Sequence, residues 1–270
     1  MDILHNLANY NNSFNISYEK ILFKVKKNMR KLSHLFLLIS FCSFAQTAIY
    51  NPDDDVVVIE IPPHLDELRG YPSANELDSE AIIWFNLATD LIFTKPNQAI
   101  ILFKKAISKD LYFVQAYDNL AKTYRSLEEY DLATKYYLLS QKIFPKGPTA
   151  YQNLAVVYFK QEKWDEAIRQ YELLIKIDSN DPEGYYGLAK IYLDADDFVL
   201  ALKNAKKALS LYKINPPNYI GDSYAQIGLI YYYIGQKSLA KEYLEIAKVK
   251  YEENNLSEMF SHLLPLLNLL

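Results

Sequence analysis

The stretch "AYDNLAKTY" at residues 116–124 recurs along the chain with small changes. It is followed 34 residues later by "AYQNLAVVY" at 150–158 and, after another 34 residues, by "GYYGLAKIY" at 184–192. A fourth copy, "SYAQIGLIY", stands at 223–231. Each copy places Tyr three residues before Leu or Ile, then Ala or Gly, then a second Tyr three residues on. These spacings put the four side chains on one stripe of an α-helix.

A second apolar stripe follows each copy after a short polar turn. It begins at an alanine in every case, at the equivalent positions Ala133, Ala167, Ala201 and Ala240. Four positions later stand Tyr137, Tyr171, Ala205 and Leu244, and seven positions later Ser140, Leu174, Ala208 and Ala247, which is again helical spacing. Pro145 and Pro182 fall between these blocks, where a helix must end. The sequence therefore predicts helix–turn–helix units in tandem.

The period, the two stripes and the prolines between units resemble the tetratricopeptide repeat, a 34-residue helix–turn–helix unit. The resemblance covers about residues 80–254. It implies an all-α fold, a right-handed α-solenoid with units at 81–113, 114–147, 148–181, 182–220 and 221–254. The first unit is degenerate, and the fourth has five extra residues at 215–219. We expect residues 255–270 to form a capping helix over the last unit, with an exposed docking motif as the alternative.

The amino-terminal part of the chain has the layout of an export signal. Residues 29–46 read "MRKLSHLFLLISFCSFAQ", with a basic start, a ten-residue apolar run and the small-residue pair Ser43 and Ala45. This layout predicts a cleaved signal peptide, with an uncleaved anchor or a buried helix as alternatives. The expected destination is the periplasm, with secretion also open, and no membrane span is expected after cleavage. Residues 1–28 are expected to be upstream or disordered sequence.

Residues 47–79 break every helical pattern and are expected to form an extended linker. "NPDDD" at 51–55 is acidic and turn-like, and "VVVIEI" at 56–61 is mostly β-branched. The two prolines that follow stop any helix. An alternative hypothesis is that 56–61 folds back onto the repeats and masks a groove, because β-branched apolar side chains avoid water.

Charge and composition argue against several classes of function. Residues 1–46 contain six Lys or Arg and two Asp or Glu, which leaves 23 basic against 31 acidic residues, a net charge of −8, for residues 47–270. An acidic body repels phosphate backbones, so no nucleic acid is expected as a ligand. Cys42 is the only cysteine, and His64 and His262 have no partners at metal-ligand spacing. Without hydrolase, zinc-protease or phosphate-loop motifs, we expect no catalysis and no cofactor or metal.

The resemblance also implies where a partner would bind. In tetratricopeptide arrays the first helix of each pair lines a concave groove, in which peptides commonly lie extended. Asparagine amides there can donate to and accept from a peptide backbone, and aromatic residues are enriched at binding hot spots. The candidate binding residues that flank the stripe are Asn119, Lys122, Asn153, Val156, Phe159, Tyr186, Lys190, Leu193, Tyr232 and Tyr233.

The sequence thus predicts a non-catalytic scaffold that binds a protein or peptide segment in the groove of a helical repeat array. One alternative is a structural subunit of an envelope assembly that uses its convex face or cap. Another is a carbohydrate-binding or hydrolytic protein with a tyrosine-rich groove. The identity of the partner and the oligomeric state stay open at this stage.

Overall fold

The computed structural model describes residues 49–51, 56–58, 77–214, 216–217 and 219–270, so the predicted signal segment lies outside the described residues. Two short strands precede the helices in the sequence. β1 (Ile49–Asn51) pairs antiparallel with β2 (Val56–Val58), with Tyr50 opposite Val57. The strand pair differs from the expected extended linker, because the β-branched run finds hydrogen-bonding partners a few residues upstream. Masking of a groove by 56–61 stays a prediction.

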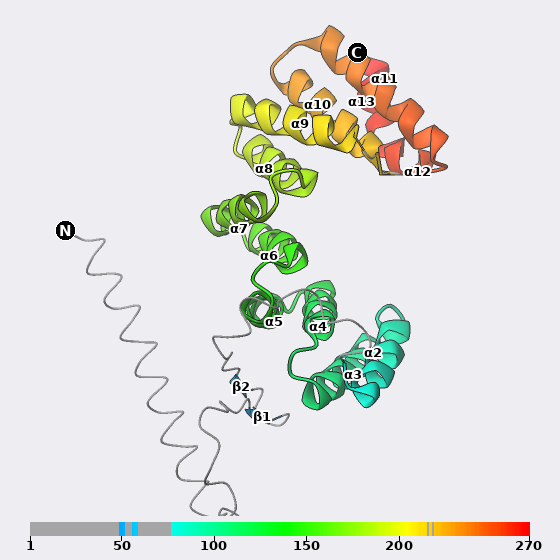
Figure 1. Cartoon of the computed structure of the whole chain (residues 1–270). Coiled ribbons are helices and arrows are strands. Elements are labelled where there is room, and N and C mark those ends of the chain that lie inside the picture. Colours follow the sequence, from blue (N-terminus) through cyan, green and yellow to red (C-terminus); the bar gives the residue numbers. More distant parts are fainter. Residues whose placement is uncertain (1–48, 52–55, 59–76, 215, 218) are drawn as a thin grey trace, which may run out of the picture. The chain divides into compact units, whose positions relative to one another are not determined.

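Ten helices in the described part of the chain form five successive pairs, shown in order in Figure 1. The pairs are α2 (Ser79–Leu91) with α3 (Pro96–Lys109), α4 (Val114–Ser126) with α5 (Tyr130–Ile143), α6 (Pro148–Lys160) with α7 (Trp164–Ile177), α8 (Pro182–Asp194) with α9 (Phe198–Tyr212), and α10 (Ile220–Tyr233) with α11 (Lys237–Glu253). Each helix packs on the helix that precedes it and the helix that follows it. The predicted all-α solenoid of helix pairs is confirmed.

Prolines and capping side chains explain where several helices begin. Pro96, Pro148 and Pro182 each occupy the first position of a helix, where a missing backbone N–H costs nothing. The carboxylate of Asp78 accepts hydrogen bonds from the first turn of α2, and that of Asp181 accepts one from the first turn of α8. These caps satisfy N–H groups that have no partner within the helix.

The first tyrosine of the stripe ties its helix to the loop before it. The Tyr117 hydroxyl donates to the Leu111 carbonyl at 3.1 Å, and the Tyr151 hydroxyl donates to the Pro145 carbonyl at 3.0 Å. Tyr185 repeats the contact with the carbonyl six residues before it, at 3.4 Å. In the second, third and fourth units, one tyrosine therefore contributes both ring packing and a bond that fixes the inter-unit loop.

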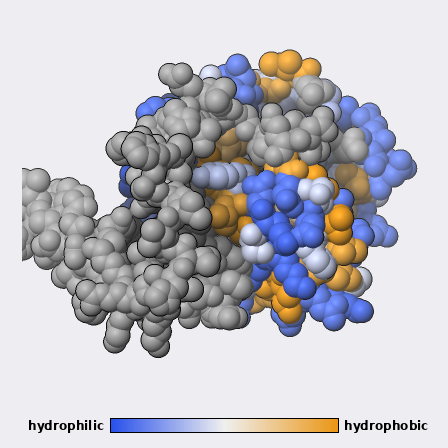
Figure 2. Space-filling view, turned by 60° about the horizontal axis from the view of Figure 1, so that its bottom comes forward, coloured by the Kyte–Doolittle hydropathy of each residue, from blue (hydrophilic) through white to orange (hydrophobic). Residues whose placement is uncertain are grey.

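Small residues let neighbouring helices approach closely. A Cβ atom added at Gly187 would lie 2.1 Å from the ring of Tyr171 on α7, so α8 can pack at this depth only because position 187 has no side chain. Ala121, Ala155 and Ala189 in the stripes are fully buried. In the view of Figure 2, the hydrophobic residues left at the surface stand in groups among hydrophilic ones.

The turn within the second, third, fourth and fifth pairs uses the left-handed backbone conformation. Glu128, Glu162 and Asp196 have φ values of 62°, 59° and 58°, and Gly235 has 83°. Only the last of these four turns has the residue that adopts this conformation without steric cost. The turn geometry is therefore set by the repeat and not by local sequence preference.

The carboxyl-terminal segment covers α11 with three short helical pieces and not with the single capping helix expected. These are α12 (Ser257–Phe260), the 3₁₀ helix η2 (Ser261–Leu263) and α13 (Leu264–Leu269). Phe260 is buried against Tyr251, with ring centroids 5.7 Å apart. Pro265 lies in the first turn of α13, where a missing backbone N–H costs nothing. No helix in the described ranges is long and apolar enough to span a membrane.

Candidate functional site

The first helices of the second to fifth pairs form one continuous surface, which we call the groove face. Within it, α4 contacts α6, α6 contacts α8, and α8 contacts α10. Of the candidate residues on the first two of these helices, Lys122 is exposed, and Asn119, Asn153 and Val156 are half-buried. The groove face is thus built from residues 34 positions apart that the repeat places side by side.

Asn153 is held by bonds within the protein. The Arg125 guanidinium donates to the Asn153 side-chain oxygen at 2.9 Å, and the Asn153 side-chain nitrogen donates to the Thr149 carbonyl at 2.9 Å. The first bond joins α4 to α6 across the boundary between two units. Asn153 therefore fixes the spacing of neighbouring helices as well as lying on the groove face.

Phe159, Trp164 and Lys190 form a cluster that spans the third and fourth pairs. The rings of Phe159 and Trp164 meet edge to face, with centroids 5.2 Å apart. The Lys190 ammonium group lies 5.0 Å from the centroid of the Phe159 ring, within the range of a cation–π contact. Lys190 and Trp164 are exposed, and Leu193, on the same helix as Lys190, is half-buried. This cluster offers both an apolar and a cationic surface.

Glu183 joins three successive pairs. Its two carboxylate oxygens accept from the Gln152 side-chain amide at 2.8 Å, from the Tyr212 hydroxyl at 2.5 Å and from the Tyr219 hydroxyl at 3.2 Å. These donors come from α6, from α9 and from the segment before α10. Burial and the nearby Glu183 raise the pKa of Tyr212, so its hydroxyl stays protonated and able to donate.

Tyr186 is the most enclosed of the candidate tyrosines. Its backbone carbonyl accepts from the Gln226 side-chain amide at 3.3 Å, and its ring meets that of Tyr212 edge to face at 6.4 Å. Burial, followed by the charges of Asp222 and Glu183, raises the pKa of Tyr186. The Tyr251 hydroxyl donates to Asp222. The fourth and fifth pairs therefore share a tyrosine–carboxylate pattern.

The structure places Tyr233 beside α9. Its ring stacks on Phe198 at the start of α9, with centroids 6.0 Å apart and an interplanar angle of 4°. Tyr232 contacts Tyr233 edge to face and is itself exposed. The candidate residues thus fall into a polar and aromatic set on the groove face and an aromatic pair at the end of α10.

Sequence reasoning missed Phe198, Tyr212 and Tyr219 as partners of the candidate residues. One signal was available for Tyr212: it stands 29 residues after Glu183, as Tyr251 stands 29 residues after Asp222. Tyr219 lies in the stretch of five extra residues, which follows no repeat position. In the part of the chain that the structure describes, no three His, Cys, Asp or Glu side chains gather as a metal site.

Comparison with known proteins identifies the repeats. A TPR repeat model matches residues 157–195, and a tetratricopeptide repeat model matches 114–146 and 221–247. The chain therefore contains tetratricopeptide repeats at these residues, in agreement with the helix pairs. No curated protein matches the sequence.

Solved structures share this fold at low sequence identity. A MamA protein is 21% identical with a TM-score of 0.52, and the match covers 65% of this chain and 94% of that one. MamA from Desulfovibrio magneticus RS-1 is 15% identical with a TM-score of 0.55, covering 66% and 98%. A chain of an APC/C hetero-tetramer is 19% identical with a TM-score of 0.57, covering 63% of this chain but 33% of that one. At these identities the likeness concerns the fold.

Proposed function

We propose that the protein is a non-catalytic scaffold that binds an extended segment of a partner protein along the groove face. The supporting observation is that polar side chains of this face are bonded across unit boundaries. Arg125 bonds Asn153, and Gln152 bonds Glu183. These bonds hold the surface in one arrangement before binding, which lowers the entropy cost of association.

The exposed residues of the groove face suit a partner segment that has acidic or apolar side chains and backbone N–H and C=O groups without internal hydrogen bonds. Lys122 and Lys190 supply positive charge on an otherwise acidic protein, and Phe159 supplies a ring already contacted by a cation. An extended segment has backbone N–H and C=O groups that require partners, and Asn119 can donate to one and accept from the other.

The test reverses the charge of two exposed groove lysines, Lys122→Glu with Lys190→Glu. The matched control is Lys237→Glu with Lys241→Glu on α11, where both lysines are also exposed. Proteins cross-linked to the full chain in native cells are recovered and quantified by mass spectrometry, with circular-dichroism melting as a check on folding.

We expect the groove variant to lose at least about tenfold in recovery of one partner, because each reversed contact in a water-like medium costs about 1 kcal/mol. The control variant should recover that partner at the level of the unchanged protein. Equal recovery by both variants would place contact on another surface and refute binding in the groove.

We also propose that the protein is exported, on the strength of the basic, apolar and small-residue layout of 29–46. Mass spectrometry of the protein purified from cells should find no peptide from residues 29–46. Recovery of an intact 29–46 peptide from the mature protein would contradict cleavage. Fractionation of the cells would then distinguish a retained anchor from a cytoplasmic protein.

A further inference from the structure

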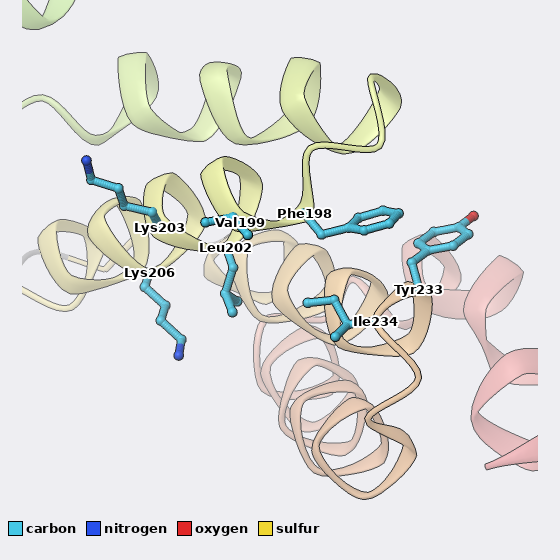
Figure 3. Close-up of a pocket in the computed structure, with 7 residues that line it drawn as sticks. All are labelled: Phe198, Val199, Leu202, Lys203, Lys206, Tyr233 and Ile234. Atoms are coloured by element: carbon cyan, nitrogen blue, oxygen red, sulfur yellow. The ribbon is translucent and has the colours of Figure 1, made fainter.

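A second surface, which we call the edge pocket, lies where α9 begins and α10 ends. The pocket has a volume of about 680 Å³, and its apolar lining is Phe198, Val199, Leu202, Tyr233 and Ile234. Figure 3 shows the rings of Phe198 and Tyr233 facing each other at one end, with Leu202 and Val199 farther along α9. The edge pocket therefore joins the fourth and fifth pairs through side chains that the repeat stripes do not include.

The apolar lining is unusually exposed. Val199 is 79% exposed, Tyr233 is 58% exposed and Ile234 is 39% exposed. Adjacent apolar side chains left in water are costly, and such patches mark interaction sites. The core explains the apolar residues of the stripes, but it does not explain these three.

Comparison between units shows that the repeat does not require Val199. This residue stands two positions before the stripe alanine of α9. The equivalent residues in the other four pairs are Asn97, Asp131, Asp165 and Ser238, all of them polar. Helices with the same packing therefore begin with a polar residue at this position.

Tyr233 departs from the repeat in the same way. It stands two positions after the second stripe tyrosine, where the second, third and fourth pairs have Ser126, Lys160 and Asp194. The degenerate first pair has Phe93 at this position, also exposed. Two positions that are polar in the second and third pairs are therefore apolar here, and the fold brings these two side chains into one pocket. Neither replacement adds to the buried core.

Two lysines give the edge pocket a positive end. Figure 3 shows Lys203 and Lys206 at the end away from the aromatic rings, with their ammonium groups pointing in different directions. Both are exposed, and α9 contains no acidic residue. The Lys206 ammonium group lies 5.4 Å from the centroid of the Tyr231 ring. On a chain of net charge −4, these two lysines form a local positive patch.

We propose that the edge pocket docks a segment of a partner protein that presents a large apolar side chain next to Asp or Glu. The apolar side chain fills the pocket, and the carboxylates meet Lys203 and Lys206. A second copy of this chain fits less well, because a two-fold contact through the same patch brings four like charges together. The proposal does not depend on binding in the groove face.

The test uses fluorescent twelve-residue peptides that share a Leu-Trp-Leu core and differ only in their flanks, which are acidic, serine or lysine. Fluorescence polarisation measures their binding to the full chain. The acidic-flanked peptide should bind at least about tenfold more tightly than the serine-flanked peptide, with the lysine-flanked peptide weakest. No binding, or equal binding of all three peptides, would overturn the proposal.

Val199→Asp is the diagnostic variant, since it restores the residue found in two other pairs and places an acid in the first turn of a helix, which is favourable. It should weaken the acidic-flanked peptide about tenfold, the factor that goes with one buried aliphatic side chain. The control is Val249→Asp on α11, where Val249 is 48% exposed. Equal effects of the two substitutions would refute the assignment.

Two further measurements separate the remaining outcomes. Lys203→Glu with Lys206→Glu should reverse the preference between acidic and lysine flanks; an unchanged preference would overturn the charge argument. Sedimentation should give the same oligomeric state for Val199→Asp and the unchanged protein. A dimer that dissociates in the variant would overturn the proposal in favour of self-association.

Discussion

Tyr137 and Tyr212 are both almost completely buried, yet their hydroxyl groups meet opposite surroundings. The Tyr137 hydroxyl is buried without a hydrogen-bond partner among the described residues, whereas the Tyr212 hydroxyl donates to the Glu183 carboxylate at 2.5 Å. An unsatisfied buried hydroxyl costs free energy, and a bond to a charged acceptor gains it. The two rings therefore contribute similarly to stability through packing, but their hydroxyl groups contribute in opposite directions.

Replacement by phenylalanine separates the two contributions. Tyr137→Phe should leave the free energy of unfolding unchanged or raise it by about 1 kcal/mol, because the variant removes an unpaired polar group. Tyr212→Phe should lower it by about 1.5–3 kcal/mol, the usual loss for a bond to a charged partner. Urea denaturation followed by circular dichroism measures both. Equal destabilisation by the two substitutions would contradict the assigned hydrogen bonds.

For single residues, the sequence predicts which side chains are buried better than it predicts their hydrogen-bond partners. The stripe positions Tyr117 and Tyr124 are buried, in line with their helical spacing. The partner of a polar group is set by which residues meet across units, and Arg125 and Asn153 are 28 residues apart. No local pattern encodes such a contact, so the organisation of the candidate site could be seen only in three dimensions.

The turn between the two helices of a pair shows how the element constrains the residue. Glu128, Glu162 and Asp196 adopt positive φ, although the left-handed region disfavours residues with a Cβ atom. Gly235 occupies the equivalent turn of the last pair, and a Cβ added there would meet no atom within 4 Å. A side chain at position 235 would therefore be disfavoured by its own backbone conformation and not by contact with neighbouring residues.

Exchanging residues between the turns tests this reading. Asp196→Gly should raise the free energy of unfolding by up to about 1 kcal/mol, because relief of the backbone strain exceeds the entropy cost of glycine. Gly235→Ala should lower it by about 1 kcal/mol. Chemical denaturation measures both variants, and stabilisation by Gly235→Ala would contradict the turn conformation.

Helices that belong to the repeats were predictable from the sequence, whereas the strands and the carboxyl-terminal helices outside the repeats were less so. The helix pairs follow from a pattern that recurs every 34 residues, so errors in one copy are corrected by the others. β1 and β2 are three residues each and too short to show alternation, and Pro265 fits both the end of a helix and the start of one. The strand pair and the divided cap were therefore missed.

Buried tyrosine side chains are distributed over most of the helix pairs. Burial is the largest cause of a raised pKa at Tyr137, Tyr171, Tyr186, Tyr212 and Tyr251. These tyrosines belong to helices from the second to the fifth pair. A single chemical change, loss of the phenolic proton, therefore acts on the array at several places at once.

We predict cooperative unfolding at alkaline pH. The pKa of Tyr171 is raised from 10.0 to about 12 in the folded state, so its contribution to stability is full below pH 10 and is lost as the pH rises through 12. The unfolded chain releases the proton more readily, so rising pH favours it. Absorbance at 295 nm and circular dichroism should change together between these pH values. Tyrosine ionisation that is complete before helicity falls would contradict this coupling.

The order of the contacts along the array has a mechanical consequence. Each pair packs mainly on the pairs before and after it, so a pulling force applied at the two ends would be carried from pair to pair in series. Such a chain lengthens in steps as units open, each step being about 3.5 Å for every residue released. The stretch of five extra residues at 215–219 would make one step longer than the others, and the Glu183 contacts lie beside it. The hydrogen bonds from Tyr212 and Tyr219 to Glu183 would therefore have to break before this segment could extend.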